Sequence, residues 1–123
     1  MIKHIAEPVA FAVVRWLPSS QGGRSSGPPT APVYAATCIF PLGDDREVHP
    51  DWPRGAEQFS ILLEEVEKLP DGDRVCKVGF LAPDLAEPFV YPGADVLVME
   101  GPKVVANAVI REVVTRTGMG QPR

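Results

Sequence analysis

Short runs in which apolar residues alternate with polar or small ones recur along the chain, separated by segments rich in proline and glycine. A period of two is the pattern of β-strands whose two faces meet different surroundings. Six segments have this character, at residues 9–17, 33–40, 59–66, 74–81, 95–100 and 103–114. The pattern predicts an all-β protein of six strands.

The last two segments read as a β-hairpin. Gly101-Pro102 supplies a two-residue connection between residues 95–100 and 103–114, and such short connections join antiparallel neighbours. A strand of twelve residues is long for a globular protein. We therefore expect a β-bulge near Asn107.

The segment at residues 59–66 fits two patterns. Phe59, Leu62, Leu63 and Val66 recur at helical spacing, whereas Phe59, Ile61 and Leu63 alternate as in a strand. We interpret the segment as a strand, with a helix as the alternative.

Both cysteines lie in such strands. Cys38 follows Thr37 in an apolar run, and Cys76 shares one face of residues 74–81 with Val78 and Phe80, which predicts half burial of that strand. We expect buried free thiols, with a disulfide or a redox role as the alternative. The spacing of the cysteines and histidines does not match a zinc site.

The connecting segments are expected to be loops. Residues 18–32, 41–57 and 82–94 are rich in turn-forming residues, and the first of them, which lacks a large apolar anchor, is expected to be mobile. Residues 1–114 are expected to form a single domain, and 115–123 a disordered tail.

Composition narrows the function. The 123 residues include 45% hydrophobic residues, 14 Pro and 11 Gly, which suits a packed globule of short strands, and the formal net charge is −4. An acidic chain repels the phosphate backbone, so nucleic-acid binding is disfavoured. The sequence has no signal-peptide pattern and no apolar run long enough for a membrane span, so we expect a cytoplasmic protein.

The chain offers little for catalysis. Asp44, Asp45, Glu47 and His49 form its one cluster of carboxylates and imidazole, but the cluster lacks a second histidine nearby and reads as a solvated loop. The sequence also has no nucleophile elbow and no phosphate-binding loop. We expect a protein that is not an enzyme and has no cofactor or metal; a small hydrolytic or ligand-binding enzyme with a loop site around Asp45 and His49 is the alternative.

Two stretches carry a resemblance to a known family. The first strand is followed by Gly22-Gly23-Arg24, and the chain closes on a hairpin in which Gly93, Glu100 and Gly101 are spaced as in the third, C-terminal domain of elongation factor Tu. The sequence resembles that domain over most of its length. It departs from the family where Met99 replaces an arginine and where alanines at 106 and 108 replace two glycines.

The resemblance implies a six-stranded antiparallel closed β-barrel, which agrees with the strand count. It also implies that the nucleotide-binding domain of the elongation factor is missing from this chain, so GTP hydrolysis is not expected. In that family the barrel contacts tRNA and protein partners.

We therefore expect a binding module that engages a protein partner through its loops. Arg24, Trp52 and Tyr91 are the candidate partner-binding residues, because arginine and large aromatic residues dominate protein interfaces. The alternatives are the loop-site enzyme described above and a structural homo-oligomer formed by barrel edges.

Overall fold

The computed structural model of the protein describes residues 4–41 and 57–114, so Trp52, the group from Asp44 to His49 and the tail at 115–123 lie outside the described residues. The strands are β1 (Ala10–Trp16), β2 (Tyr34–Ile39), β3 (Phe59–Lys68), β4 (Arg74–Phe80), β5 (Asp95–Glu100) and β6 (Lys103–Val113). Three short helical turns accompany them: η1 (Ser19–Gln21), α2 (Pro83–Ala86) and η2 (Glu87–Phe89).

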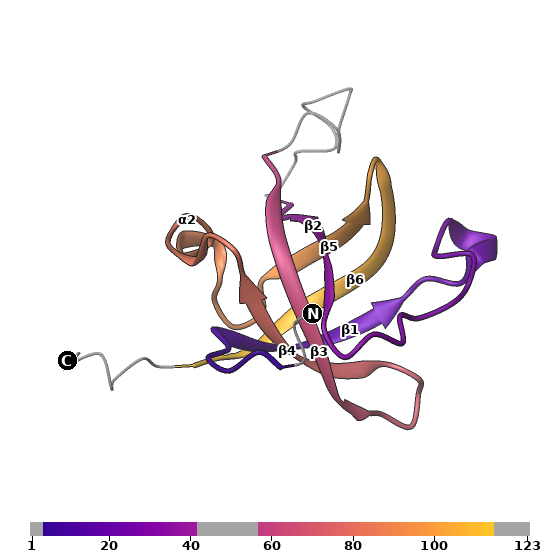
Figure 1. Cartoon of the computed structure of the whole chain (residues 1–123), viewed down its shortest axis with the longest axis horizontal. Coiled ribbons are helices and arrows are strands. Elements are labelled where there is room, and N and C mark those ends of the chain that lie inside the picture. The colour runs from indigo at the N-terminus through magenta and orange to yellow at the C-terminus, as the bar shows by residue number, and fades with distance from the viewer. Residues whose placement is uncertain (1–3, 42–56, 115–123) are drawn as a thin grey trace.

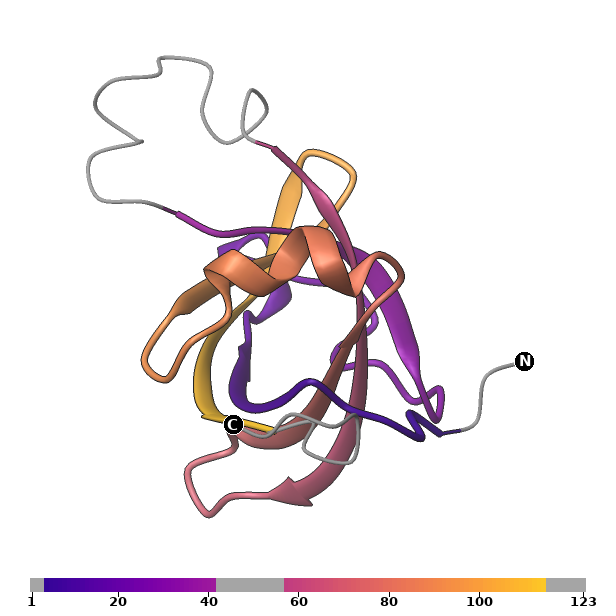
Figure 2. The same cartoon turned by 90° about the vertical axis from the view of Figure 1, so that its left-hand side faces the viewer.

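The six strands form a closed barrel in the order β1-β4-β3-β2-β5-β6, with every neighbouring pair antiparallel. Figure 1 shows the strands from the side, and Figure 2 looks along the barrel toward the end that α2 and η2 cover. The predicted all-β class and the six-stranded antiparallel barrel are confirmed.

Side chains that point inward from alternating positions fill the barrel interior. On β1 they are Ala10, Ala12 and Val14. On the remaining strands the same core cluster includes Cys38, Ile61, Leu63, Cys76, Val78, Phe80, Val96, Val98, Ala106, Ala108 and Ile110. Small residues are concentrated on β1 and β6, which pair with each other, and larger ones lie on β3, β4 and β5. The wall formed by β1 and β6 therefore contributes four alanine methyl groups to the core together with Val14 and Ile110.

The hairpin of β5 and β6 has the expected connection, since Glu100 pairs with Lys103 across the turn. The expected bulge near Asn107 is confirmed, although Asn107 itself pairs regularly with Leu97 and with Arg15. The irregularities fall on either side of it. Val98 pairs with Ala106 and Met99 with Val104, so Val105 is an extra residue of β6 in its pairing with β5. In the pairing of β6 with β1, Phe11 pairs with Glu112 and Ala12 with Ile110, so Arg111 is a second extra residue. The bulges bend a long strand around the barrel while Asn107 stays in register.

Residues 59–66 are strand, as predicted, and belong to β3, which runs on to Lys68.

The half burial predicted for β4 is wrong in part, because its outward-facing Val75 and Gly79 are buried as well. A Cβ atom on Gly79 would lie 3.3 Å from Cγ2 of Ile5. The segment before β1 therefore packs closely on the outside of β4, and glycine leaves room for it.

Residues 82–94 are not the plain loop that their prolines suggested, because they contain α2 and η2. Pro83 occupies the start of α2, where its missing N–H costs nothing. Ala86 is fully buried, and Phe89 stacks on Phe40 with ring centroids 5.3 Å apart and also contacts Phe59. The two helical turns therefore plug one end of the barrel (Figure 2).

Cys38 and Cys76 are free and buried, as expected. Burial raises the pKa of each thiol to about 12. Both therefore stay protonated at neutral pH and act as small core residues. Within residues 4–41 and 57–114, no helix has the length and apolar character needed to cross a membrane.

The small residues on β1 and β6 allow a test of which face of β6 points into the core. Replacing Ala106 by leucine forces extra methyl groups against Trp16 and Val98, its partners across two seams, and should lower the free energy of unfolding by about 1–3 kcal/mol. Asn107→Leu is the matched control, because the neighbouring side chain points outward and is exposed; it should change stability by less than about 0.5 kcal/mol. Urea unfolding measures both, and equal effects would contradict the assignment of the interior face.

Candidate functional site

The barrel has two ends with different surfaces. The cap end is the one covered by α2 and η2, and the loop end carries residues 17–33 and the turns at 69–73 and 101–102. Figure 1 shows the loop that contains η1 on the opposite side of the barrel from α2. Each end is a candidate for contact with another molecule.

At the loop end, two glycines shape the segment that follows β1. Gly22 has a φ of +89°, which favours glycine, and a Cβ on Gly23 would lie 1.8 Å from the carbonyl oxygen of Leu17. The Gly23 amide donates to the carbonyl of Pro18 at 3.0 Å. These contacts fold the loop back on itself and direct the next residue, Arg24, toward the barrel.

Arg24 is bound within the protein. Its Nε donates to Oε2 of Glu100 at 2.8 Å, Nη1 donates to the carbonyl of Gly27 at 2.5 Å, and the guanidinium lies 5.6 Å from the ring centre of Tyr34. The Tyr34 hydroxyl donates to the same carboxylate. Arg24 therefore tethers the loop at 18–32, which was expected to be mobile, to the end of β5.

This arrangement shifts two pKa values. The hydroxyl of Tyr34 and the guanidinium of Arg24 hold the pKa of Glu100 below its ordinary value, against the effect of partial burial. Burial and the neighbouring carboxylate raise the pKa of Tyr34. At neutral pH the cluster is therefore a carboxylate that accepts from a neutral phenol and a guanidinium.

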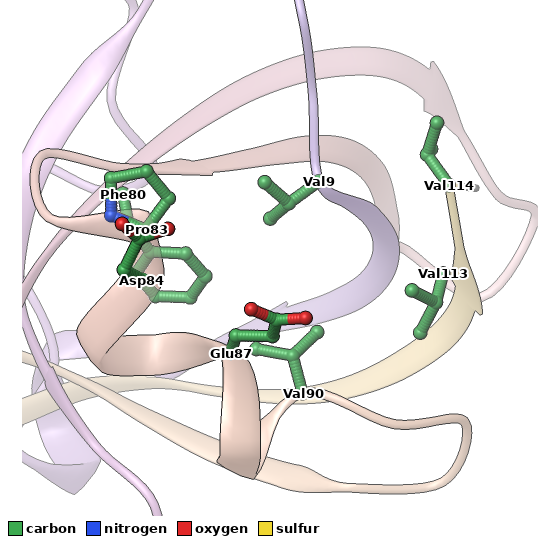
Figure 3. A pocket seen from close by; sticks show the side chains of 8 residues that line it. All are labelled: Val9, Phe80, Pro83, Asp84, Glu87, Val90, Val113 and Val114. Atoms are coloured by element: carbon green, nitrogen blue, oxygen red, sulfur yellow. The ribbon is translucent and has the colours of Figure 1, made fainter. Parts of the chain in front are cut away.

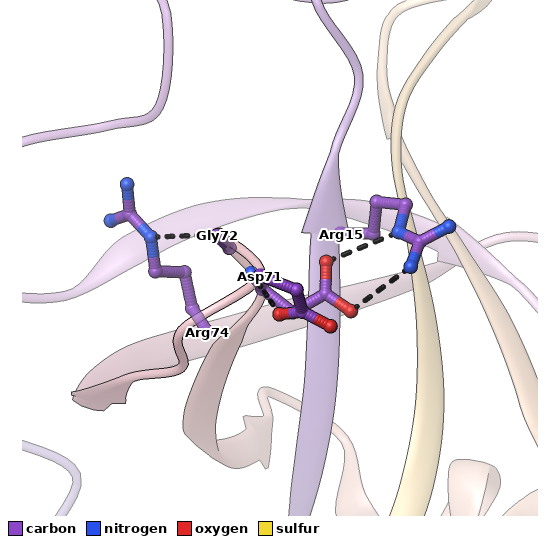
Figure 4. Close-up of polar contacts among 5 residues, drawn as sticks. Arg15, Asp71, Gly72 and Arg74 are labelled. Atoms are coloured by element: carbon purple, nitrogen blue, oxygen red, sulfur yellow. Dashed lines mark hydrogen bonds and ion pairs between the residues drawn. The ribbon is translucent and has the colours of Figure 1, made fainter.

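Other charges at the loop end are also paired. Arg15 donates to both carboxylate oxygens of Asp73, at 3.1 and 3.3 Å, and Arg74 donates to Glu65 at 2.6 Å and to the carbonyl of Gly72 at 3.3 Å. Figure 4 shows the forked contact of Arg15 and the turn around Asp71 and Gly72. The guanidinium groups of Arg15, Arg24 and Arg74 are therefore all bound to carboxylates of their own chain.

Tyr91 lies at the cap end, 52% exposed, in the turn between η2 and β5. Because β5 runs from that turn to Glu100, the length of the strand separates Tyr91 from Arg24. The structure therefore does not bring these two predicted partner-binding residues together. Trp52, the third, lies outside the described residues, as do Asp45 and His49.

The cap end has a pocket of about 100 Å³ between the plug and the two termini of the barrel. Its walls are apolar, with two carboxylates among them: Val9, Phe80, Pro83, Asp84, Glu87, Val90, Val113 and Val114 (Figure 3). The pocket therefore depends on three segments far apart in sequence, which the closed barrel places side by side.

A second, more open depression of about 260 Å³ shares part of this wall. It lies along the segment from His4 to Val9 and is floored by Leu62, Gly79 and Phe80. Glu64 holds that segment down, accepting from the Ile5 amide at 2.8 Å and contacting His4 Nδ1 at 3.1 Å. These two contacts hold the pKa of Glu64 below its ordinary value, so the carboxylate is charged and the segment is fixed at neutral pH.

Exposed apolar side chains gather at the same end. Of six large apolar residues that are exposed in the described part of the chain, Leu81 (67%), Leu85 (65%), Tyr91 and Val113 lie at the cap end. Single exposed apolar residues are ordinary, but several beside a pocket mark a contact surface. We call Leu81, Leu85, Tyr91 and the adjoining 100 Å³ pocket the cap surface.

Sequence reasoning missed Leu81, Leu85 and Glu87. Leu81 ends an apolar run and looks like the last residue of a buried strand, and a four-residue helix is too short to show periodicity. The one available signal was the dense group of apolar residues and prolines at 81–91.

Within residues 4–41 and 57–114, no group of three or more His, Cys, Asp or Glu side chains is placed to hold a metal ion. The sequence matches no protein-family model and no curated protein.

The hydrogen bond between Tyr34 and Glu100 makes stability depend on pH. Tyr34→Phe should raise the pKa of Glu100 toward its ordinary value of 4.5 and lower the free energy of unfolding at pH 7 by about 1 kcal/mol. Because the pKa of Glu100 is lower in the folded protein, its stabilisation is present above pH 4.5 and lost as the pH falls through the folded value. The variant should therefore lose less stability on acidification.

NMR titration of the Glu100 carboxyl and urea unfolding at pH 7 and pH 3 measure these effects. Tyr91→Phe is the control, because no hydrogen bond of the Tyr91 hydroxyl is found among the described residues. An unchanged Glu100 pKa in Tyr34→Phe would refute the assigned hydrogen bond.

Proposed function

We propose that the protein is a non-enzymatic binding module that engages a protein partner through the cap surface. The observation that carries this proposal is the contrast between the two ends of the barrel. At the loop end Arg15, Arg24 and Arg74 are paired with carboxylates of their own chain. At the cap end apolar side chains remain exposed beside an apolar pocket.

Burial of the cap surface supplies a driving force for association. Covering a leucine fully contributes about 1.5–3 kcal/mol, and Leu81 and Leu85 each have about two thirds of their surface available. Tyr91 adds a large ring with a polar tip, a side chain that is common in interfaces. The plug beneath them, fixed by the stacking of Phe40 and Phe89, holds this surface in place before binding and so reduces the entropy lost on binding.

Arg24, the loop-end residue predicted to bind the partner, has a different role in this proposal. Its ion pair of 2.8 Å with Glu100 holds residues 18–32 in place. In this proposal Arg24 therefore stabilises the loop and does not contact the partner. Tyr91 keeps its predicted role, and Leu81 and Leu85 join it.

The same proposal includes kinship with the third domain of elongation factor Tu, as a stand-alone barrel. What supports it is the pair of motifs quoted above, together with the contact between Arg24 of the first motif and Glu100 of the second. A common contact gives a physical reason for the two motifs to occur together. The kinship would place the partner in the translation apparatus or among proteins that act on it, and cytoplasmic location fits that expectation.

A comparative capture experiment tests the proposal. The full chain, the double variant Leu81→Ser/Leu85→Ser and the control Val66→Ser are immobilised and exposed to extract of the native cell. Val66 is also exposed, at 47%, but belongs to β3 near the loop end. We expect a protein that the wild type and Val66→Ser retain and that the double variant loses, with at least tenfold weaker affinity when the purified partner is titrated.

Capture of the same proteins by all three baits, or of none, would refute a protein-binding cap surface. The amide NMR spectrum of each variant establishes that the barrel is intact. Analytical ultracentrifugation of the free protein detects self-association. If the protein self-associates through the cap surface, the partner is a second copy of the chain.

A further inference from the structure

The pocket of the cap surface combines apolar walls with a carboxylate that projects among them. Val9 belongs to the segment before β1, Val90 follows η2, Val113 ends β6 and Val114 follows it. Figure 3 shows Glu87 extending from η2 with its carboxylate directed into the space that these valines surround. A ligand group that fits must be aliphatic along its sides and cationic at one point.

The charged side chains that line the pocket are both carboxylates. Asp84 and Glu87 line the pocket and Glu7 lines the adjoining depression, and neither lining includes a lysine or arginine. Among residues 4–41 and 57–114, these three carboxylates form no ion pair, in contrast with Glu64, Glu65, Asp73 and Glu100. Like charges repel, so an acidic segment, a phosphopeptide or a nucleic acid is disfavoured here.

Lysine and arginine side chains match a pocket that has apolar walls and a carboxylate. Their methylene stems lie along apolar surface while the charged group stays at a polar, wetter position. Leu81 follows Phe80 and Leu85 follows Asp84, two residues of the pocket lining, so these exposed leucines can contact apolar residues next to the basic one.

We propose that the partner inserts a lysine or arginine side chain into this pocket, its stem against Val9, Val90 and Val113 and its cation beside Glu87, from a segment whose neighbouring residues are apolar. This inference rests on the proposed function and specifies the chemistry of the partner. Because the carboxylates are at the surface, their main effect is on selection among segments, and the ion pair itself contributes a factor of about five in affinity.

Three synthetic peptides test the inference without knowledge of the partner. They have the form acetyl-Ser-Leu-X-Leu-Ser-amide, with X as lysine, norleucine or glutamate; norleucine keeps the stem and removes the ammonium group. The full chain with labelled valine methyl groups is titrated with each by NMR. We expect the lysine peptide to shift the methyl signals of Val9, Val90 and Val113, and the norleucine and glutamate peptides to bind about fivefold and at least tenfold more weakly.

Charge variants make the test specific. Glu87→Gln should reduce the preference for lysine over norleucine to near unity, and Asp84→Lys/Glu87→Lys should reverse the order of the lysine and glutamate peptides. Glu67→Gln, at an exposed position on β3, is the matched control and should leave the preference unchanged.

Equal binding of the three peptides, binding that leaves the pocket valines unshifted, or absence of binding at millimolar peptide would overturn the inference. The proposed function has a separate outcome. If Leu81→Ser/Leu85→Ser loses the captured partner while Glu87→Gln retains it at full affinity, the cap surface binds a protein and the basic side chain is not part of the contact.

Discussion

The narrow interior of a six-stranded barrel is the constraint on which the rest of this structure depends. Closing so few strands leaves room for packed side chains and no more. The chain meets this limit by placing Ala10 and Ala12 opposite β6, where Ala106 and Ala108 also face inward. The larger aliphatic residues of β3, β4 and β5 then fill the volume from the other side. Among the described residues, no Asp, Glu, Lys, Arg or His is buried.

The aromatic side chains of the barrel pack at its two ends. Trp16 and Tyr34 pack edge to face at the loop end, with ring centroids 5.2 Å apart, and arginine pairs cover that end. At the cap end Phe40, which follows β2, packs with phenylalanines of β3, β4 and η2 to form the plug. The plug holds α2 in an orientation that leaves its Leu85 side chain exposed to solvent. The proposed function places partner binding at this end, where apolar side chains remain exposed.

The strands and the final hairpin could be predicted from the sequence because alternation and a Gly-Pro turn are local signals. The candidate binding residues could not be predicted, because their positions depend on contacts between distant segments. In the sequence Arg24 has no evident partner, but in the structure it pairs with Glu100, 76 positions away. The two residues lie close together because β2 and β5 are neighbouring strands. Likewise Val9, Glu87 and Val113 share a pocket only once β1 and β6 are paired. Residues 59–66 carried two periodicities, and pairing of β3 with β2 and β4 selected the strand.

Closure depends most on the pairing of β2 with β5, which has three residue pairs, Thr37 with Met99, Cys38 with Val98 and Ile39 with Leu97, fewer than any other seam. Native-state hydrogen exchange of the backbone amides that bond across this seam tests closure directly. In a closed barrel those amides should exchange only by global unfolding, with the same free energy as the central amides of β1 and β4. Exchange through a local opening several kcal/mol below the global free energy would show an open sheet and contradict the account.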